Sequence, residues 1–63
     1  MNQKTLIARL RQLLAVDKNA FDIYIELSKL TQDQDQRKAF SSIAVDEKRH
    51  VMLSEEMLSL LEK

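Results

Sequence analysis

The stretch TQDQDQRK, Thr31 to Lys38, is the longest part of the chain without an apolar side chain. It divides a chain of 63 residues that has no glycine and no proline and is rich in leucine, alanine, lysine and glutamate, all of which favour helix. The sequence therefore predicts an all-α protein whose single turn lies in this stretch. Asp33 is expected to cap the second helix, and Gln36, three residues on, completes a capping-box pattern.

Two helices are predicted, at about residues 3 to 31 and 34 to 62, and the tight turn makes them an antiparallel hairpin in one domain, residues 1–63. Steps of three and four pick out a stripe on each helix, a pattern typical of shallow packing in bundles. The first stripe is Leu6, Leu10, Leu13, Asp17, Ala20, Tyr24 and Leu27. The second is Phe40, Ile43, Glu47, His50, Ser54, Met57 and Leu61. These stripes are predicted to form the seam between the helices.

Polar residues interrupt both stripes at one level. Folding about the turn places Asp17 opposite His50 and Ala20 opposite Glu47, because each step along one helix is a step back along the other. Buried carboxylates and imidazoles are normally paired, protonated or bound to metal, since an isolated buried charge is costly. The three polar residues are therefore a candidate site.

The apolar surface is wider than one seam requires. Beside the two stripes run the rows Ile7, Leu14 and Phe21, and Ala44, Val51 and Leu58. One hairpin cannot cover both flanks, so we expect a homodimer that forms a four-helix bundle. Apolar residues that would still face outward are Val16, Ile23, Leu30, Leu53 and Leu60. They indicate a homo-oligomer larger than the dimer.

The charges exclude several partners. Ten basic residues balance ten acidic ones and are interspersed with them, so neither nucleic acid nor an anionic membrane is expected. No apolar run approaches the roughly 18 residues of a membrane span, and the N-terminus lacks the apolar core of a signal peptide, which predicts a cytoplasmic protein. Because the chain has no cysteine, disulfides and thiolate metal sites are excluded.

Two-fold symmetry would double the polar set to two Asp, two Glu and two His. That is the ligand count of di-iron carboxylate bundles, in which a Glu-x-x-His pair directs both side chains from one helix face. Such oxygen and nitrogen donors suit iron, and also manganese or zinc, which the sequence does not separate. The predicted metal ligands are Asp17, Glu47 and His50.

A simpler alternative remains open. An Asp17–His50 salt bridge can fix the register of the helices without any metal, although it leaves Glu47 unpaired. Taken alone, Glu47-x-x-His50 is a weak signal in so charged a chain. Tyr24, one layer from the cluster, is equally compatible with core packing and with a hydroxyl that bonds a ligand carboxylate.

The pattern also resembles a known family. Asp17-x-x-Ala20-x-x-x-Tyr24-x-x-Leu27-Ser28, then Asp33, Phe40, Ala44 and Glu47-Lys48-Arg49-His50, is similar to the rubrerythrin-like branch of the ferritin superfamily, and most of all to the encapsulated ferritins. Asp17 stands where that family has glutamate, and Asn19 where it has another acidic residue.

The resemblance implies a half-ferritin hairpin with a di-iron site shared across a dimer interface. In that site Glu47 would bridge or chelate iron and His50 would be a nitrogen ligand. Tyr24 would not bind iron itself but would contact the ligands. The implied activity is that of a ferroxidase, which oxidises Fe(II) with dioxygen, and the implied setting is an encapsulin shell. Two alternatives stay open: a rubrerythrin-like peroxide reductase, which usually has a cysteine-held electron donor, and a non-enzymatic helical assembly module with a structural metal or a buried ion pair.

Overall fold

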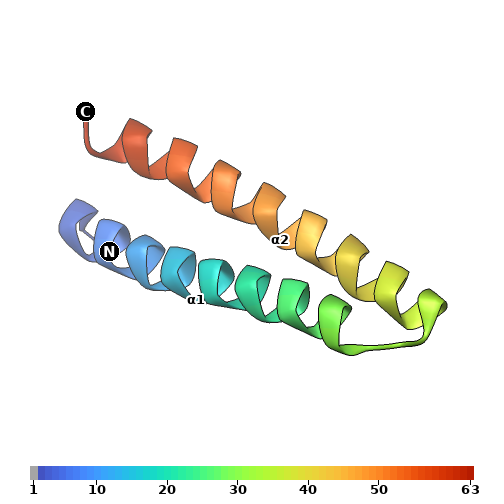
Figure 1. Cartoon of the computed structure of the whole chain (residues 1–63). Helices are drawn as coiled ribbons and strands as arrows, with labels where there is room; N and C mark the ends of the chain where they lie inside the picture. Colours follow the sequence, from blue (N-terminus) through green and yellow to red (C-terminus); the bar gives the residue numbers. More distant parts are fainter. Residues whose placement is uncertain (1) are drawn as a thin grey trace.

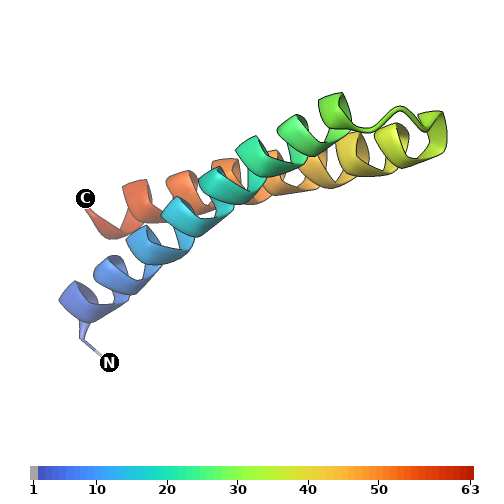
Figure 2. The same cartoon turned by 60° about the horizontal axis from the view of Figure 1, so that its bottom comes forward.

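The computed structural model describes residues 2–63, which form two antiparallel helices, α1 (Gln3–Leu30) and α2 (Gln34–Leu61), lying side by side (Figure 1, Figure 2). The predicted all-α hairpin is confirmed, and each helix ends one residue before the predicted boundary. The rod measures 47 × 14 × 14 Å. Within residues 2–63, neither helix has an apolar stretch long enough to cross a membrane.

Thr31, Gln32 and Asp33 connect the helices. The predicted cap is confirmed, because the Asp33 carboxylate accepts hydrogen bonds from the N–H groups of Asp35 at 2.8 Å and Gln36 at 3.2 Å. The predicted capping box is wrong in its second half. The Thr31 hydroxyl donates to the Gln36 side chain at 2.8 Å and accepts the N–H of Asp33 at 3.3 Å. Thr31 therefore stands between the two groups that a capping box would join directly.

Each end of the rod is closed by a hydrogen bond between the helices. Near the turn, the Arg37 guanidinium donates to the carbonyl of Thr31 at 3.0 Å. At the open end, the Gln3 amide donates to the carbonyl of Leu61. Both carbonyls lie at helix C-termini, where no backbone donor of the same helix is available, so these bonds satisfy otherwise unpaired groups.

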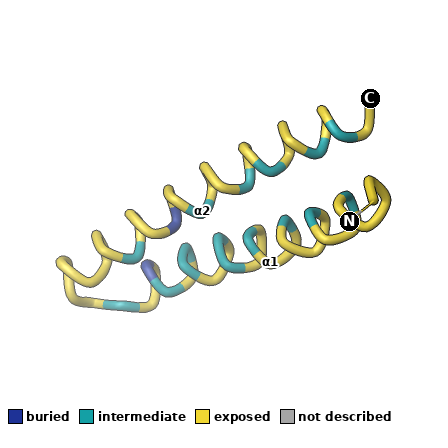
Figure 3. Tube along the Cα trace, turned by 180° about the vertical axis from the view of Figure 1, so that it is seen from behind, coloured by how far each residue is buried: buried dark blue, intermediate teal, exposed yellow. Residues whose placement is uncertain are grey.

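The seam between the helices is rotated from the predicted one but keeps much of it, since nine of the fourteen predicted seam residues are half-buried. Ala44 is 1% exposed and Ser28 is 8% exposed, and these buried positions lie toward the turn (Figure 3). Because these side chains are small, the helices can approach closely at Ser28 and Ala44. Each helix therefore directs the row of residues that contains its small side chain toward the other helix. The rows turned inward include Ile7, Leu14, Phe21, Val51 and Leu58, which are half-buried. Predicted seam residues that are instead exposed are Leu6, Leu13, Ile43, His50 and Met57.

A single hairpin leaves much of its apolar surface in contact with water. No large side chain of residues 2–63 is fully buried, and the accessible surface is 5062 Å². A compact monomer of 7.4 kDa exposes only about 4,200 Å². The excess, roughly 850 Å², is close to the area of about 800 Å² that one partner contributes to a standard protein interface. The outward rows Val16, Ile23, Leu30, Leu53 and Leu60 are exposed, as the sequence predicts.

Candidate metal centre

Asp17 on α1 and Glu47 and His50 on α2 lie at one level near the middle of the rod, with one possible ligand atom from each within 4.8 Å of the others. Glu47 and His50 reach the same place because residues three apart are neighbours on a helix surface. Asp17 joins them because the antiparallel turn brings the middle of α1 level with the middle of α2. The three residues predicted to meet therefore do lie together, while their role as metal ligands stays a prediction.

The three side chains differ in their surroundings. Asp17 and Glu47 are half-buried, whereas His50 is exposed. The Oε2 atom of Glu47 is buried and has no hydrogen-bond partner. A buried polar atom without a partner costs free energy, so the surroundings of this oxygen lack a group that would stabilise it. A cation or a donor placed beside Glu47 would complete it.

Ion pairs of residues 2–63 join the helices elsewhere, between Arg11 and Glu62 and between Lys18 and Glu55, the latter at 3.6 Å. Neither pair includes a residue of the cluster. The Asp17–His50 salt bridge of the simpler alternative is therefore not formed in the described hairpin. Glu47 likewise has no cationic side chain at ion-pair distance.

The donor set of the cluster fits a divalent metal. Carboxylate and imidazole ligands bind such ions at about 2.1 Å, so opposed ligands of one ion lie about 4.2 Å apart. The observed limit of 4.8 Å among the three donors is slightly wider, and small side-chain rotations would close the difference. One hairpin offers three ligands, fewer than the four of a closed zinc site. The cluster is therefore open to ligands from outside the hairpin.

The cluster borders an apolar side of the hairpin, here called the open face, which consists of Leu6, Leu13, Ile43, His50 and Met57. A groove of about 400 Å³ lies on it, lined by Leu6, Arg9, Leu10, Leu13, Met57 and Leu61. His50 is seven residues from both Ile43 and Met57, which is close to two helical turns, so all three lie on one side of α2. On α2, His50 of the cluster thus lies between two exposed apolar side chains, Ile43 and Met57.

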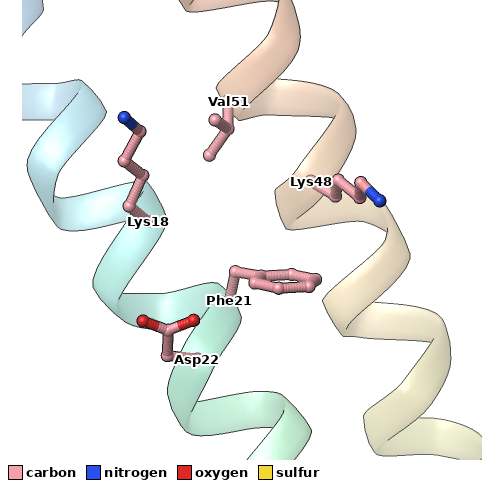
Figure 4. A pocket seen from close by; sticks show the side chains of 5 residues that line it. All are labelled: Lys18, Phe21, Asp22, Lys48 and Val51. Atoms are coloured by element: carbon pink, nitrogen blue, oxygen red, sulfur yellow. The ribbon is translucent and has the colours of Figure 1, made fainter.

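The other side of the hairpin is charged, and both ion pairs cross the seam there. Figure 4 shows one groove on this side, where Phe21 and Val51 reach between the helices while Lys48 points away from α1. In projection down α1, Lys18 and Leu13 lie on opposite sides of the half-buried Leu14. The hairpin therefore has one solvated face and one apolar face, and the cluster borders the apolar one.

Tyr24 is half-buried, and its ring centroid lies 6.5 Å from that of Phe40 across the seam. The structure thus gives it a packing role. Tyr24 follows Asp17 by seven residues, or about 10 Å along the helix axis. A supporting role of its hydroxyl toward the ligands stays a prediction.

No family model, curated protein or solved structure matches the chain. The likeness to the encapsulated ferritins therefore stays a resemblance of residue pattern. What supports a function is the cluster of Asp17, Glu47 and His50 together with the open face around it.

Proposed function

We propose that two copies of the hairpin pair through their open faces and act as a ferroxidase, binding two Fe(II) ions and oxidising them with dioxygen. The observation that carries the proposal is the juxtaposition of Asp17, Glu47 and His50, in which a buried Glu47 oxygen has no partner. Iron is the substrate in this reaction. The cytoplasm is the expected location, and an encapsulin compartment is the setting that the ferritin-like resemblance implies.

The area supports a partner for the hairpin, and symmetry supports pairing through the open faces. The hairpin exposes roughly 850 Å² more than a compact chain of its mass, which is about what one partner buries in a standard interface. A two-fold contact brings the same surface of both copies together. It would therefore place six ligands, two each of Asp, Glu and His, around one centre.

Each type of ligand has a distinct part in this proposal. Two Fe(II) ions together give two electrons, which with two protons from water reduce one dioxygen to hydrogen peroxide, and the higher charge of the Fe(III) product favours carboxylate oxygens. Asp17 and Glu47 supply that negative charge, and the neutral imidazole of His50 supplies nitrogen. The apolar side chains of the second copy exclude water from around the charges, which strengthens their attraction for the cation.

Manganese and zinc would fit the same donors, and zinc has no redox chemistry. A non-enzymatic assembly module is the second candidate, and the observation in its favour is the open face itself, whose apolar side chains need a partner whether or not metal binds. In that case the cluster would hold a structural ion or none. Peroxide reduction has no observation of its own in its favour.

Native mass spectrometry of protein prepared without oxygen, mixed with Fe(II) and then exposed to air, tests the proposal. The expected result is two irons per dimer and a rise of near-ultraviolet absorbance that requires oxygen. A dimer that takes up no iron would contradict the ferroxidase and leave the assembly module. Two zinc ions per dimer, with no uptake of Fe(II), would favour the structural-metal form of that module.

A further inference from the structure

The side of α2 that faces away from α1 carries an exposed stripe that is separate from the open face. This outer stripe consists of Val45, Arg49, Met52, Leu53, Glu56 and Leu60. A shallow hollow of about 300 Å³ lies on it, lined by Val45, Lys48, Arg49, Met52, Leu53 and Glu56. The four apolar members are each more than half exposed. Steps of three and four, with a single-residue step from Met52 to Leu53 at the centre, keep the members on one side of the helix.

The charged members of the outer stripe have no partners within the hairpin. Among residues 2–63, neither Arg49 nor Glu56 forms an ion pair, while the neighbouring Glu55 pairs with Lys18. Arg49 and Glu56 are seven residues, or about 10 Å, apart on α2, which is too far for them to pair with each other. A partner with a matching charge pattern would therefore have to come from another molecule.

The outer stripe is complementary to itself when it is reversed. Arg49 lies three residues before Met52, and Glu56 lies three residues after Leu53. Val45 and Leu60 lie seven residues before and after the same pair. Reversing the helix about the midpoint of Met52 and Leu53 therefore brings Arg49 level with Glu56 and leaves an apolar centre between two opposite-charge pairs.

We propose that this stripe is a second self-association surface, on which α2 of another copy packs antiparallel about a two-fold axis at Met52 and Leu53. Two Arg49–Glu56 ion pairs flank the axis, and the contact runs over about 22 Å of helix from Val45 to Leu60. The contact is isologous, so it joins the hairpins in pairs. Together with pairing of the open faces, it gives each hairpin two different contacts and links dimers into larger assemblies.

The side of α1 that faces away from α2 carries one exposed apolar row, Val16, Ile23 and Leu30, with the small or polar residues Ala8, Gln12, Ala15 and Asn19 beside it. Reversal about Ile23 brings Val16 level with Leu30 but sets Glu26 level with Ala20, so no pair of opposite charges on that face flanks the row. The ion-paired side of the hairpin has its charges matched internally. The unpaired charges and the apolar centre of α2 therefore select a second α2 as the partner.

Charge reversal tests the contact. We expect Arg49→Glu and Glu56→Arg each to weaken one association step roughly tenfold, because both ion pairs become like-charge pairs. The double variant carries both reversals, restores both pairs and should return to the parent mass distribution in native mass spectrometry or sedimentation. Its recovery also shows that neither substitution prevents folding.

The outcome is independent of the proposed ferroxidase, because neither residue lies in the metal cluster. Iron uptake per chain should be equal in the parent and all three variants. The proposal is overturned if the single reversals leave the parent's mass distribution unchanged, if the double variant does not recover it, or if the parent is monomeric at every concentration. If the double variant recovers the parent mass distribution but neither it nor the parent takes up iron, the result contradicts the proposed ferroxidase alone.

Discussion

Glu47 and His50 lie three residues apart on α2, yet Glu47 is half-buried with an unpaired oxygen while His50 is exposed on the open face. Three residues turn a helix by about 300°, so the two side chains leave it about 60° apart. One points into the seam and the other to its edge. An ion held by both would lie at the border of the hairpin, where a second copy can add its own ligands.

His50→Ala should abolish iron oxidation while leaving the helices formed. The imidazole is exposed, so its removal creates no cavity in the seam. Oxygen consumption in the presence of Fe(II) measures the activity, and far-ultraviolet circular dichroism measures the helix content. Lys48→Ala is the matched control, since Lys48 is exposed on the other side of α2. Oxidation at the parent rate in His50→Ala would place the site elsewhere.

Glu47→Gln should remove iron binding without lowering the stability of the metal-free protein. The substitution changes a half-buried carboxyl group whose buried Oε2 atom has no hydrogen-bond partner, so it removes no hydrogen bond or ion pair of that atom. Urea denaturation at a fixed protein concentration measures stability, and Glu26→Gln at an exposed position is the control. A loss of more than about 1 kcal/mol in Glu47→Gln alone would show that Glu47 has a native partner.

Asp17→Glu should keep or raise the rate of iron oxidation. The extra methylene extends the reach of the carboxylate toward donors that now lie within 4.8 Å of it. Asp17→Asn has nearly the same size as the parent side chain but no charge, and it should lose activity. A marked loss of activity in Asp17→Glu would mean that the shorter side chain is required, contrary to the alignment with the ferritin-like pattern.

Leu13→Lys should raise the dimer dissociation constant by at least about tenfold, because it places a charge in the apolar part of the open face. Lysine favours helix nearly as well as leucine, so the hairpin should persist. Ala15→Lys, at an exposed position away from the groove, is the control. Equal dissociation constants in sedimentation for both variants would argue against pairing of the open faces.

Asp33→Ala should lower the free energy of unfolding by about 1 kcal/mol, since the carboxylate caps two N–H groups at the start of α2. Gln32→Ala in the same connection should have little effect. Thermal unfolding at one protein concentration provides the comparison. Equal midpoints for the two variants would mean that water replaces the cap without cost.

Local chemistry explains why the cap was predictable and the full turn was not. Asp33 caps α2 through groups two and three residues away, so its role can be inferred from the sequence. The bond from Thr31 to Gln36 depends on where the end of α1 meets the start of α2. That meeting is set by the path of the chain through the turn, which residue spacing does not specify.

The sequence by itself determined the two helices, their turn and the level at which Asp17, Glu47 and His50 meet, because helical rise and antiparallel folding fix which residues are level. Only the tertiary structure decided which faces touch. The apolar surface of each helix is wider than one contact, and the small side chains of Ser28 and Ala44 allow the closest approach on one part of it. The contact between the helices is therefore centred nearer Ser28 and Ala44 than the sequence predicts, and His50 lies on the open face.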